Sequence, residues 1–423
     1  MADFMAGYGE CILTSPTGIE LTGYGYYLDR RAEAVLDELK VRALCLRTEL
    51  SEVILVSCDL LGFTVEFSDT VRRAVAAELN IAFANILLAC THIHSGPALQ
   101  SLRGLGNVEA GYPEKVTVAI KEAIKLAVAD LQKAEFSYRL EAVEPIGFNR
   151  RNKNFEPIDQ TLKTAVFKRN GERIYLLSYA CHPVVLGTTK KISADWPGAL
   201  IREIEEGGDR GIFFQGFCGD IDPVSNKNRW GKGTQDDLKL YGHLLYSRVR
   251  VAERYAQASQ KVSLNAVEKR VSLPLTVAGR GGIEQEKQSW LKRHEGDSSR
   301  ERFIEEWAQE AVKKCGEPGK NRYLDNVPIQ AISIGDLQVL GVPGEVFCRY
   351  GLRLQERRPS LFTFGYTGGN IGYLPTSEAY QTADDYACYG APKCYRLFPF
   401  SRDVEDTVLK KCNEVLTDLE LLG

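Results

Sequence analysis

Apolar residues in the first half of the chain form two patterns, short continuous runs and helical repeats. The runs Val53–Val56 and Ile86–Ala89 are typical of strands buried on both faces of a sheet. Ser68 can cap a helix between them, and a longer helix with Pro113 in its first turn follows the second run. The apolar repeats of these helices are Val71, Val75 and Leu79, then Val116, Ile120, Ile124 and Val128. Strand, helix, strand, helix predicts an α/β fold.

The same patterns continue through the second half. Apolar runs predict strands at 173–180, 211–214, 331–342 and 361–364, and amphipathic spacing predicts helices near 235–258 and 402–421. Residues 282–320 are highly charged, with apolar side chains at helical spacing. We interpret this segment as an inserted helical arm that either packs outside the core or forms a lid over an active site. The predicted fold is α/β, with a layered mixed β-sheet core flanked by helices, and residues 1–423 form one domain.

Charge and cysteine content exclude several classes of protein. The 423 residues include 53 basic and 56 acidic side chains, which offers no electrostatic footprint for nucleic acid or an anionic membrane. No apolar run approaches the ~20 residues of a membrane span, and the N-terminus lacks the pattern of a secretion signal. Eleven cysteines without a CxxC pair do not resemble a disulfide framework or a zinc ribbon. We therefore expect a cytoplasmic enzyme.

Histidines provide the first indication of chemistry. Only five are present, and three of them (His92, His94 and His182) follow apolar strand runs. His92 and His94 are two residues apart, so in a strand they project to the same side. Ligand crevices of α/β folds open at the carboxyl ends of strands, and imidazole is the commonest zinc ligand. His243 and His294 lie in helical segments, where structural or solvated roles are expected.

A metal site built on these histidines also needs a carboxylate. Glu345 follows an apolar strand and a Pro-Gly turn, which suits either a metal ligand or an acid that counters a helix dipole. Other catalytic templates fail, because the chain has no H-E-x-x-H, G-x-S-x-G, P-loop or G-x-G-x-x-G motif. A cysteine nucleophile paired with a histidine is conceivable, although buried cysteines beside strand ends usually act as small hydrophobes.

Several ordered motifs resemble those of the neutral, non-lysosomal ceramidase family. In chain order they are Gly23-Tyr24-Gly25, Thr91-His92-Ile93-His94-Ser95-Gly96-Pro97, Asn149-Arg150, His182-Pro183, Ser193-Ala194-Asp195, Gly219-Asp220-Ile221-Asp222-Pro223, Pro343-Gly344-Glu345 and Gly372-Tyr373-Leu374-Pro375-Thr376. Each motif alone is weak. Together they span about residues 7 to 390 in the order of the family, and this makes the resemblance strong.

The resemblance implies a zinc-dependent hydrolase that cleaves the amide bond of a small N-acyl compound with a metal-bound hydroxide. Its one zinc ion per chain would be held by His92, His182, Glu345 and Tyr373. The residues that stabilise the carbonyl oxyanion would be His94, Arg150 and Tyr386, with Tyr389 as the alternative to Tyr386. Such donors suit a tetrahedral oxyanion.

Two acids could assist the metal ligands. Asp195 or Asp220 could orient a ligand histidine through its second ring nitrogen, or could cap a turn or helix instead.

The chain departs from the ceramidase pattern in two ways. Asp222 stands where ceramidases have a serine, so the polarity of the pocket should differ. The sequence also lacks the C-terminal immunoglobulin-like domain and the secretion signal of those enzymes, which favours a soluble or amphiphilic substrate. Two alternatives stay open, namely a zinc-dependent esterase or lactonase using the same site, and a non-catalytic ligand-binding protein with this fold.

Overall fold

Three main sheets form the centre of the protein in a computed structural model that describes residues 4–13, 15–259, 261–316 and 321–422. The first sheet has the order β5-β4-β3-β1-β6, with bounds Ile86–Cys90, Glu52–Cys58, Lys40–Arg47, Met5–Ile12 and Gln132–Lys133. The second has the order β12-β10-β9-β7-β14, with bounds Arg210–Gln215, Arg173–Tyr179, Thr161–Lys168, Glu135–Ala142 and Gln257–Ala258. The third has the order β15-β16-β17-β19, with bounds Leu264–Pro274, Tyr323–Ile334, Leu337–Gly341 and Phe362–Phe364.

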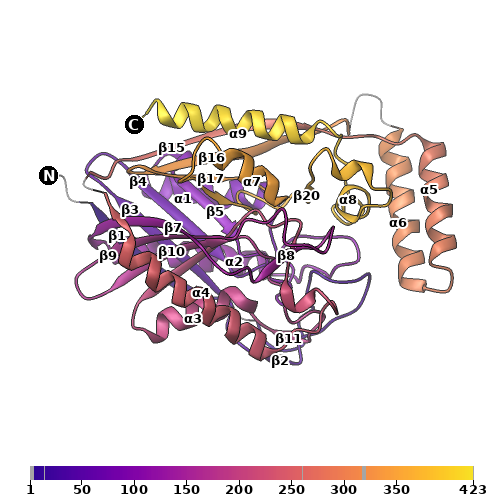
Figure 1. The fold of residues 1–423 in the computed structure, drawn as a ribbon. Helices are drawn as coiled ribbons and strands as arrows, with labels where there is room; N and C mark the ends of the chain where they lie inside the picture. The colour runs from indigo at the N-terminus through magenta and orange to yellow at the C-terminus, as the bar shows by residue number, and fades with distance from the viewer. Residues whose placement is uncertain (1–3, 14, 260, 317–320, 423) are drawn as a thin grey trace.

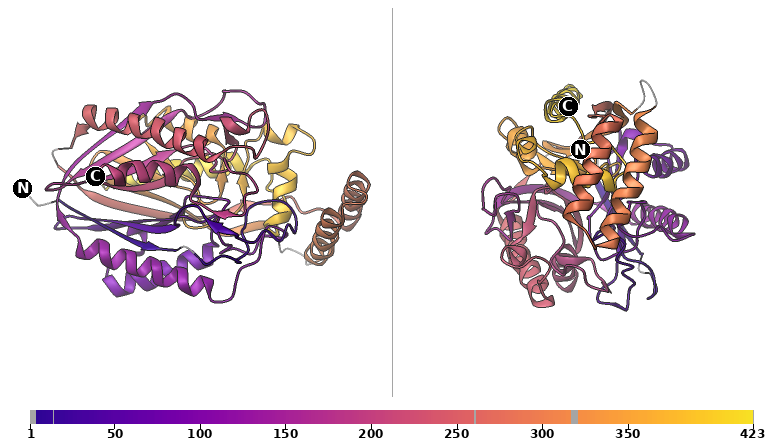
Figure 2. Two further views of the ribbon diagram at one scale, coloured as in Figure 1. Left: turned by 90° about the horizontal axis from the view of Figure 1, so that it is seen from below. Right: turned by 90° about the vertical axis from the view of Figure 1, so that its right-hand side faces the viewer.

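Helices cover the outer face of each sheet (Figures 1 and 2). The first sheet is covered by α1 (Val65–Leu79) and α2 (Tyr112–Ala129), and the second by α3 (Asp195–Glu206) and α4 (Gln235–Tyr255). The third sheet is covered by α9 (Val404–Glu420). In the left view of Figure 2, the two helix pairs lie on opposite sides of the molecule with the strands between them. This arrangement confirms the predicted α/β class and its layered, helix-flanked sheets.

The inner faces of the three sheets share one apolar core. Its members include Leu44, Leu55 and Leu87 from the first sheet, Phe167, Leu176 and Phe214 from the second, and Ile332, Val339 and Phe364 from the third. The Phe214 and Phe364 rings stack with centroids 4.6 Å apart, which joins the second sheet to the third. Helices cover the other face of the central strands β4, β5, β10 and β12, so these strands are buried on both faces and read as continuous apolar runs.

Shorter elements connect these layers. Three two-stranded pairs are β2 (Ala34–Val35) with β11 (Lys191–Ile192), β8 (Gly147–Asn149) with β13 (Ile221–Pro223), and β18 (Glu345–Val346) with β20 (Tyr373–Leu374). The remaining helical segments outside the arm are α7 (Cys348–Gln355), α8 (Ala391–Cys394), the single turns Phe83–Asn85, Val224–Asn226 and Ala379–Gln381, and a π-helical turn at Tyr386–Gly390.

Carboxyl ends of strands from all three sheets meet at one place. Strand β4 runs parallel to β5, β10 to β12, and β17 to β19. At these ends, the Cys90 amide of β5 donates to the Tyr366 carbonyl (3.2 Å) and the Gly365 amide donates to the Gln215 carbonyl of β12 (2.9 Å). Such a junction is where α/β folds place ligands.

Two sequence predictions about individual elements are wrong. Helix α1 begins at Val65 rather than after Ser68, because the Thr64 side chain accepts a hydrogen bond from the Phe67 amide and caps the helix three residues earlier. The single strand predicted at 331–342 is split between β16 and β17, which pair across a turn at Gly335 (φ 56°). Glycine allows this conformation without steric cost.

The charged segment forms a hairpin of two helices, α5 (Arg280–Arg293) and α6 (Ser298–Cys315), which projects at one end of the molecule (Figure 1). The last residues of the predicted arm, 317–320, lie outside the described residues. Phe303 of α6 packs against Tyr26 with ring centroids 4.1 Å apart and planes inclined by 37°, so the hairpin contacts the rest of the protein through aromatic side chains. A role as a lid stays a prediction.

None of the helices in the described part of the chain has the length and apolar character needed to cross a membrane.

Candidate metal centre and active site

Three histidines meet at the junction of the strand ends. His92 and His94 follow β5, and His182 follows β10. One ring nitrogen from each histidine lies within 4.8 Å of those of the other two, and the Nε2 atoms of His92 and His94 are 3.2 Å apart. His92 and His182 are almost fully buried, each 1% exposed. The structure therefore brings together the three histidines that the sequence singled out.

Main-chain carbonyls determine which nitrogen of each ring carries the proton. Each Nδ1 faces a main-chain carbonyl oxygen. His92 Nδ1 lies 2.7 Å from the Leu61 oxygen. The corresponding distances are 2.9 Å from His94 to Gly23 and 2.8 Å from His182 to Cys218. A carbonyl can only accept a hydrogen bond, so Nδ1 is the protonated nitrogen of each neutral ring. The Nε2 lone pairs then point toward the shared centre, which is the usual arrangement of histidines that bind metals.

Glu345 and Tyr373 reach the same centre through the parallel pair β18 and β20, in which they are direct partners. The Oε2 atom of Glu345 lies 3.2 Å from His182 Nε2 and 3.4 Å from His92 Nε2. This carboxylate is only 3% exposed. The alternative role of Glu345, countering a helix dipole, does not match this position, because α7 begins three residues later and the side chain faces the histidines.

These separations fit a zinc ion. Two atoms that each lie about 2.0–2.1 Å from a tetrahedral zinc are about 3.3–3.4 Å apart. The distances from Glu345 Oε2 to His182 Nε2 and to His92 Nε2, 3.2 and 3.4 Å, are close to this length. The Nε2 atoms of His92 and His94 are also 3.2 Å apart, and their lone pairs repel one another unless a proton or a cation lies between them. The donor set of imidazole, carboxylate and phenol oxygen is therefore suited to a divalent metal.

Electrostatics inside the cluster favour neutral His92 and His94 rings beside an ionised Glu345 carboxylate. Burial lowers the pKa of His92 and, together with the charges of neighbouring rings, lowers that of His94 well below its usual range. Although burial alone would raise it, contacts with His92 and His182 hold the pKa of Glu345 well below its usual value. Burial likewise opposes the shift at His182, yet the neighbouring Cys218 and Glu345 raise its pKa to about 10. Without a metal, one proton is thus held between His182 and Glu345, and a cation would displace it.

Arg150 contacts the phenol of Tyr373. One terminal nitrogen of its guanidinium donates to both the Tyr373 hydroxyl and the Gly219 carbonyl, each at 2.7 Å. The other lies 3.3 Å from Asp222. Burial raises the pKa of Tyr373 well above its usual value even though Arg150 lowers it, so the free chain holds a neutral phenol. A phenolate at this position would depend on both Arg150 and a bound cation.

A cavity of about 220 Å³ opens beside the cluster. It is lined by polar side chains (His94, Arg150, His182 and Asp222), by aromatic rings (Tyr24, Tyr26, Trp230, Tyr373 and Tyr386), and by Gly23, Gly25, Leu105 and Val184. Arg150, Asp222, Trp230 and Tyr386 also line an adjoining cavity of about 370 Å³. Asp222 is 3% exposed, so the cavity contains a carboxylate at the position where the sequence predicted an altered polarity.

Of the two tyrosines considered for the oxyanion, only one lines this cavity. Tyr386 lies at the rim, 48% exposed, with its ring centroid 5.8 Å from that of Tyr373. Tyr389 packs edge-on against Tyr380 instead, and its hydroxyl donates to the Tyr380 carbonyl. The geometry favours Tyr386 over Tyr389.

The role suggested for two aspartates is wrong. Neither Asp195 nor Asp220 orients a ligand histidine, because the Nδ1 atoms are bound to carbonyls. Asp195 accepts hydrogen bonds from the backbone amides of Val185, Leu186 and Trp196. Asp220 accepts from the Cys348 amide at 2.8 Å and from the Asn149 side chain at 2.9 Å. Both aspartates therefore hold loops in place, which was the structural alternative.

The glycine of the Gly23-Tyr24-Gly25 motif permits a close approach. Gly23 has φ 102°, and a Cβ there would lie 2.6 Å from His94 Nδ1. A side chain would displace the ring whose Nδ1 is bound to the Gly23 carbonyl. The motif thus positions His94.

Two tyrosines of the site carry no sequence signal. Tyr366 stacks on His92, with ring centroids 4.0 Å apart and planes inclined by 18°, and both residues have positive φ (55° and 65°). Strained backbone of this kind is concentrated at functional sites. The Tyr395 hydroxyl donates to Glu345 Oε1 at 2.7 Å. Neither tyrosine stands in a recognised motif, so only the structure identifies them.

Comparison with solved structures shows the same fold in ceramidases. A neutral ceramidase from Pseudomonas aeruginosa superimposes with a TM-score of 0.74 and 18% identity, covering 98% of this chain and 75% of the other. A structure described as ceramidase complexed with C2 superimposes with a TM-score of 0.78 and 17% identity, covering 99% and 76%. No protein-family model matches the sequence, and no curated protein matches it. The chain therefore has the fold of the neutral ceramidase catalytic domain, as its motifs predicted.

Proposed function

We propose that this protein is a zinc-dependent hydrolase that cleaves the amide bond of an N-acyl compound. The observation that carries the proposal is the convergence of His92, His94 and His182 on Glu345, with every Nδ1 bound to a carbonyl. A cluster of this composition has no evident structural purpose, because the same volume filled by apolar side chains would be as stable or more so. Its chemistry fits a metal.

His92, His182, Glu345 and Tyr373 are the proposed ligands. Zinc held there would polarise the substrate carbonyl and lower the pKa of a water molecule toward 7. Arg150 lies against the Tyr373 oxygen, so it stabilises the phenolate form that binds a cation. The carbonyls of Leu61 and Cys218 keep the two ligand rings in the correct tautomer.

His94 is placed to move the proton. In its neutral form the ring offers a lone pair at Nε2, so it first accepts the proton of the attacking water there. The resulting imidazolium can then donate to the oxygen of the tetrahedral intermediate and pass the proton to the departing amine. This order reconciles the carbonyl contact of Nδ1 with the oxyanion role that the resemblance implies for His94.

Arg150 and Tyr386 complete the proposed oxyanion donors, since both line the cavity beside His94. The aromatic walls of the cavity suit the apolar part of an acyl group, and Asp222 gives it a polar side. The choice of an amide over an ester rests on the likeness to ceramidases, whose reaction is amide hydrolysis. A cytoplasmic location and a small-molecule substrate stay predictions from the sequence.

A substrate panel tests the reaction class. N-acyl amines of increasing chain length are compared with the matched esters and lactones, and release of the amine or alcohol is measured with and without a chelator. We expect amide hydrolysis that disappears on chelation, returns with zinc, and is absent in Glu345→Ala. Hydrolysis of esters or lactones alone would refute the amidase assignment, and turnover that persists in Glu345→Ala would refute the site.

A further inference from the structure

The carboxylate of Glu345 has a hydrogen-bond partner on the side that faces away from the histidines. Its Oε2 atom lies beside His92 and His182, whereas its Oε1 atom accepts a hydrogen bond from the Tyr395 hydroxyl at 2.7 Å. The two oxygens of this buried carboxylate therefore have different surroundings. One is bound by a phenol, and the other faces the cluster of imidazole nitrogens.

A chain of hydrogen bonds determines the direction of the Tyr395 proton. The Gly372 amide can only donate, and it lies 3.2 Å from Asn370 Oδ1. This contact orients the Asn370 side chain so that its Nδ2 donates to the Tyr395 oxygen at 3.0 Å. Because that oxygen already accepts from Asn370, the Tyr395 proton is free to point at Glu345.

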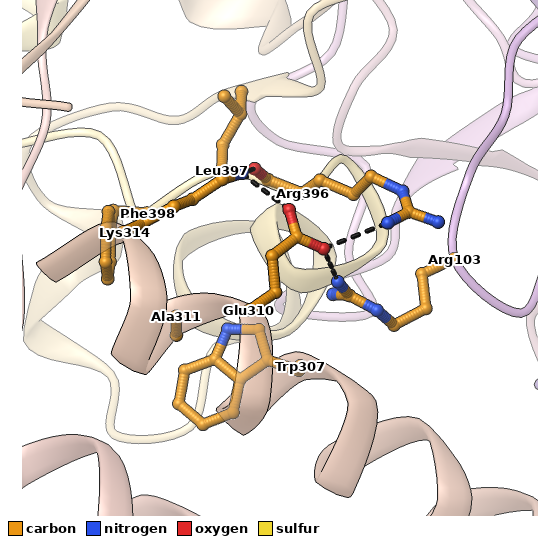
Figure 3. A pocket seen from close by; sticks show the side chains of 8 residues that line it. All are labelled: Arg103, Trp307, Glu310, Ala311, Lys314, Arg396, Leu397 and Phe398. Atoms are coloured by element: carbon orange, nitrogen blue, oxygen red, sulfur yellow. Dashed lines mark hydrogen bonds and ion pairs between the residues drawn. The ribbon is translucent and has the colours of Figure 1, made fainter. Parts of the chain in front are cut away.

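The ring of Tyr395 is also fixed by packing. It lies against Gly372 (φ 91°), where a Cβ would come within 3.0 Å of the ring. Helix α6 supports the same segment from the other side. Figure 3 shows Glu310 between Arg396, which follows Tyr395 in the chain, and Arg103. A cavity of about 10 Å³ lies beside these residues.

Arg103 continues this support toward the metal site. Its amide donates to the Cys394 carbonyl at 2.8 Å, and its guanidinium donates to the Lys393 carbonyl at 2.6 Å. The residues on both sides of Tyr395 are thus held in place by contacts that begin on the helical hairpin. This makes the hairpin a support for the active-site wall as well as a candidate lid.

We propose that Tyr395 is a positioning residue that occupies Oε1 of Glu345 and leaves Oε2 alone to bind the metal. The inference rests on the proposed metal site. It assigns Tyr395 a role in metal affinity and coordination geometry, with Asn370 directing the hydroxyl. Partners that orient a ligand carboxylate commonly contribute 10- to 100-fold to metal affinity.

Removing only the hydroxyl tests this role. In Tyr395→Phe the ring still packs on Gly372, but Oε1 of Glu345 loses its donor. We expect the zinc dissociation constant, measured by competition with a chelating dye, to rise about 10- to 100-fold. The visible absorption of the Co²⁺-loaded protein should also change, because Glu345 can then bind through both oxygens.

Two further variants make the test specific. Tyr380→Phe is the matched control, because the Tyr380 hydroxyl is buried without a hydrogen-bond partner among the described residues. It should leave metal affinity unchanged. Asn370→Ala keeps the Tyr395 hydroxyl but removes the group that directs it, so its affinity should lie between those of the wild type and Tyr395→Phe.

The outcomes separate the inference from the proposed function. A wild-type protein that binds zinc, together with unchanged affinity and an unchanged Co²⁺ spectrum in both Tyr395→Phe and Asn370→Ala, would overturn the positioning role alone. A wild-type protein that binds no metal would overturn the proposed function, and the positioning role with it. If Tyr395→Phe does not fold, Asn370→Ala decides the question by the same measurement.

Discussion

Replacing Arg150 with lysine tests the proposed oxyanion site most sharply, because the substitution keeps the positive charge and removes the planar guanidinium group. The guanidinium contacts three acceptors, Tyr373 and Gly219 at 2.7 Å and Asp222 at 3.3 Å. A lysine ammonium is a point charge on a flexible stem and lacks the planar fork that spans such a set. At least one contact is therefore lost in Arg150→Lys.

The expected loss can be estimated from the geometry. Removal of one preorganised oxyanion donor typically lowers the rate by about 10²–10³, or about 2.7–4 kcal/mol of transition-state stabilisation. A hydrogen bond to a charged group contributes about 1.5–3 kcal/mol, which is compatible with the lower part of that range. Because Arg150 also supports the Tyr373 phenolate, the variant is compared with the wild type at saturating zinc. Under that condition we expect kcat/KM for the best N-acyl amine to fall about 10²–10³-fold, mainly through kcat.

Arg151→Lys is the matched control. This neighbouring arginine pairs with Asp385 at 2.9 Å and lines only the adjoining cavity, away from the histidines. It should retain most of the activity. Equal activity of Arg150→Lys and the wild type, or an equal loss in both variants, would refute the assignment of Arg150 to the oxyanion.

Two other predictions concern stability, and both are measured by urea unfolding. The Lys393 ammonium, buried beside two tryptophan rings, pairs with Glu286 at 2.5 Å. Glu286 is partly exposed, and Lys393 keeps the Tyr389 carbonyl as an acceptor. Glu286→Gln should therefore cost about 1–2 kcal/mol, whereas the exposed Glu284→Gln should cost under about 0.5 kcal/mol; equal effects would contradict this. Burial raises the pKa of Asp195 to about 7 from 3.8. Between these two pKa values the folded state keeps a proton that the unfolded state loses. The free energy of unfolding of the wild type should therefore fall relative to that of Asp195→Asn by up to about 1.4 kcal/mol per pH unit from pH 4 to 7, and the difference should level off above pH 7. A difference that does not depend on pH would exclude the shift.

The apolar runs along the chain were sufficient to predict the site residues that directly follow strands. His92, His94 and His182 stand just after buried apolar runs, and the carboxyl ends of strands meet at a ligand site in α/β folds. Glu345 was ambiguous from its turn alone. The pairing of β18 with β20 turns it toward the histidines, and such pairing between segments distant in sequence cannot be read from either segment.

The errors have physical causes of the same kind. Ser68 was a reasonable cap, but Thr64 adopts the extended backbone of an N-cap and receives the Phe67 amide first. Tyr366 and Tyr395 act through a ring stack and a single hydrogen bond across the fold. Contacts of this type depend on tertiary packing and leave no periodicity or motif in the sequence.

The central claim is that four distant segments bind one divalent metal, and zinc stoichiometry tests it most directly. Elemental analysis of the purified protein, before and after chelation and zinc addition, should find about one zinc per chain that is lost and regained. Free zinc at 1,000 times its dissociation constant should also stabilise the folded state by about 4 kcal/mol. His182→Ala should bind substantially less zinc than the wild type. A wild-type chain that retains no zinc, and whose unfolding does not change when zinc is added, would contradict the account.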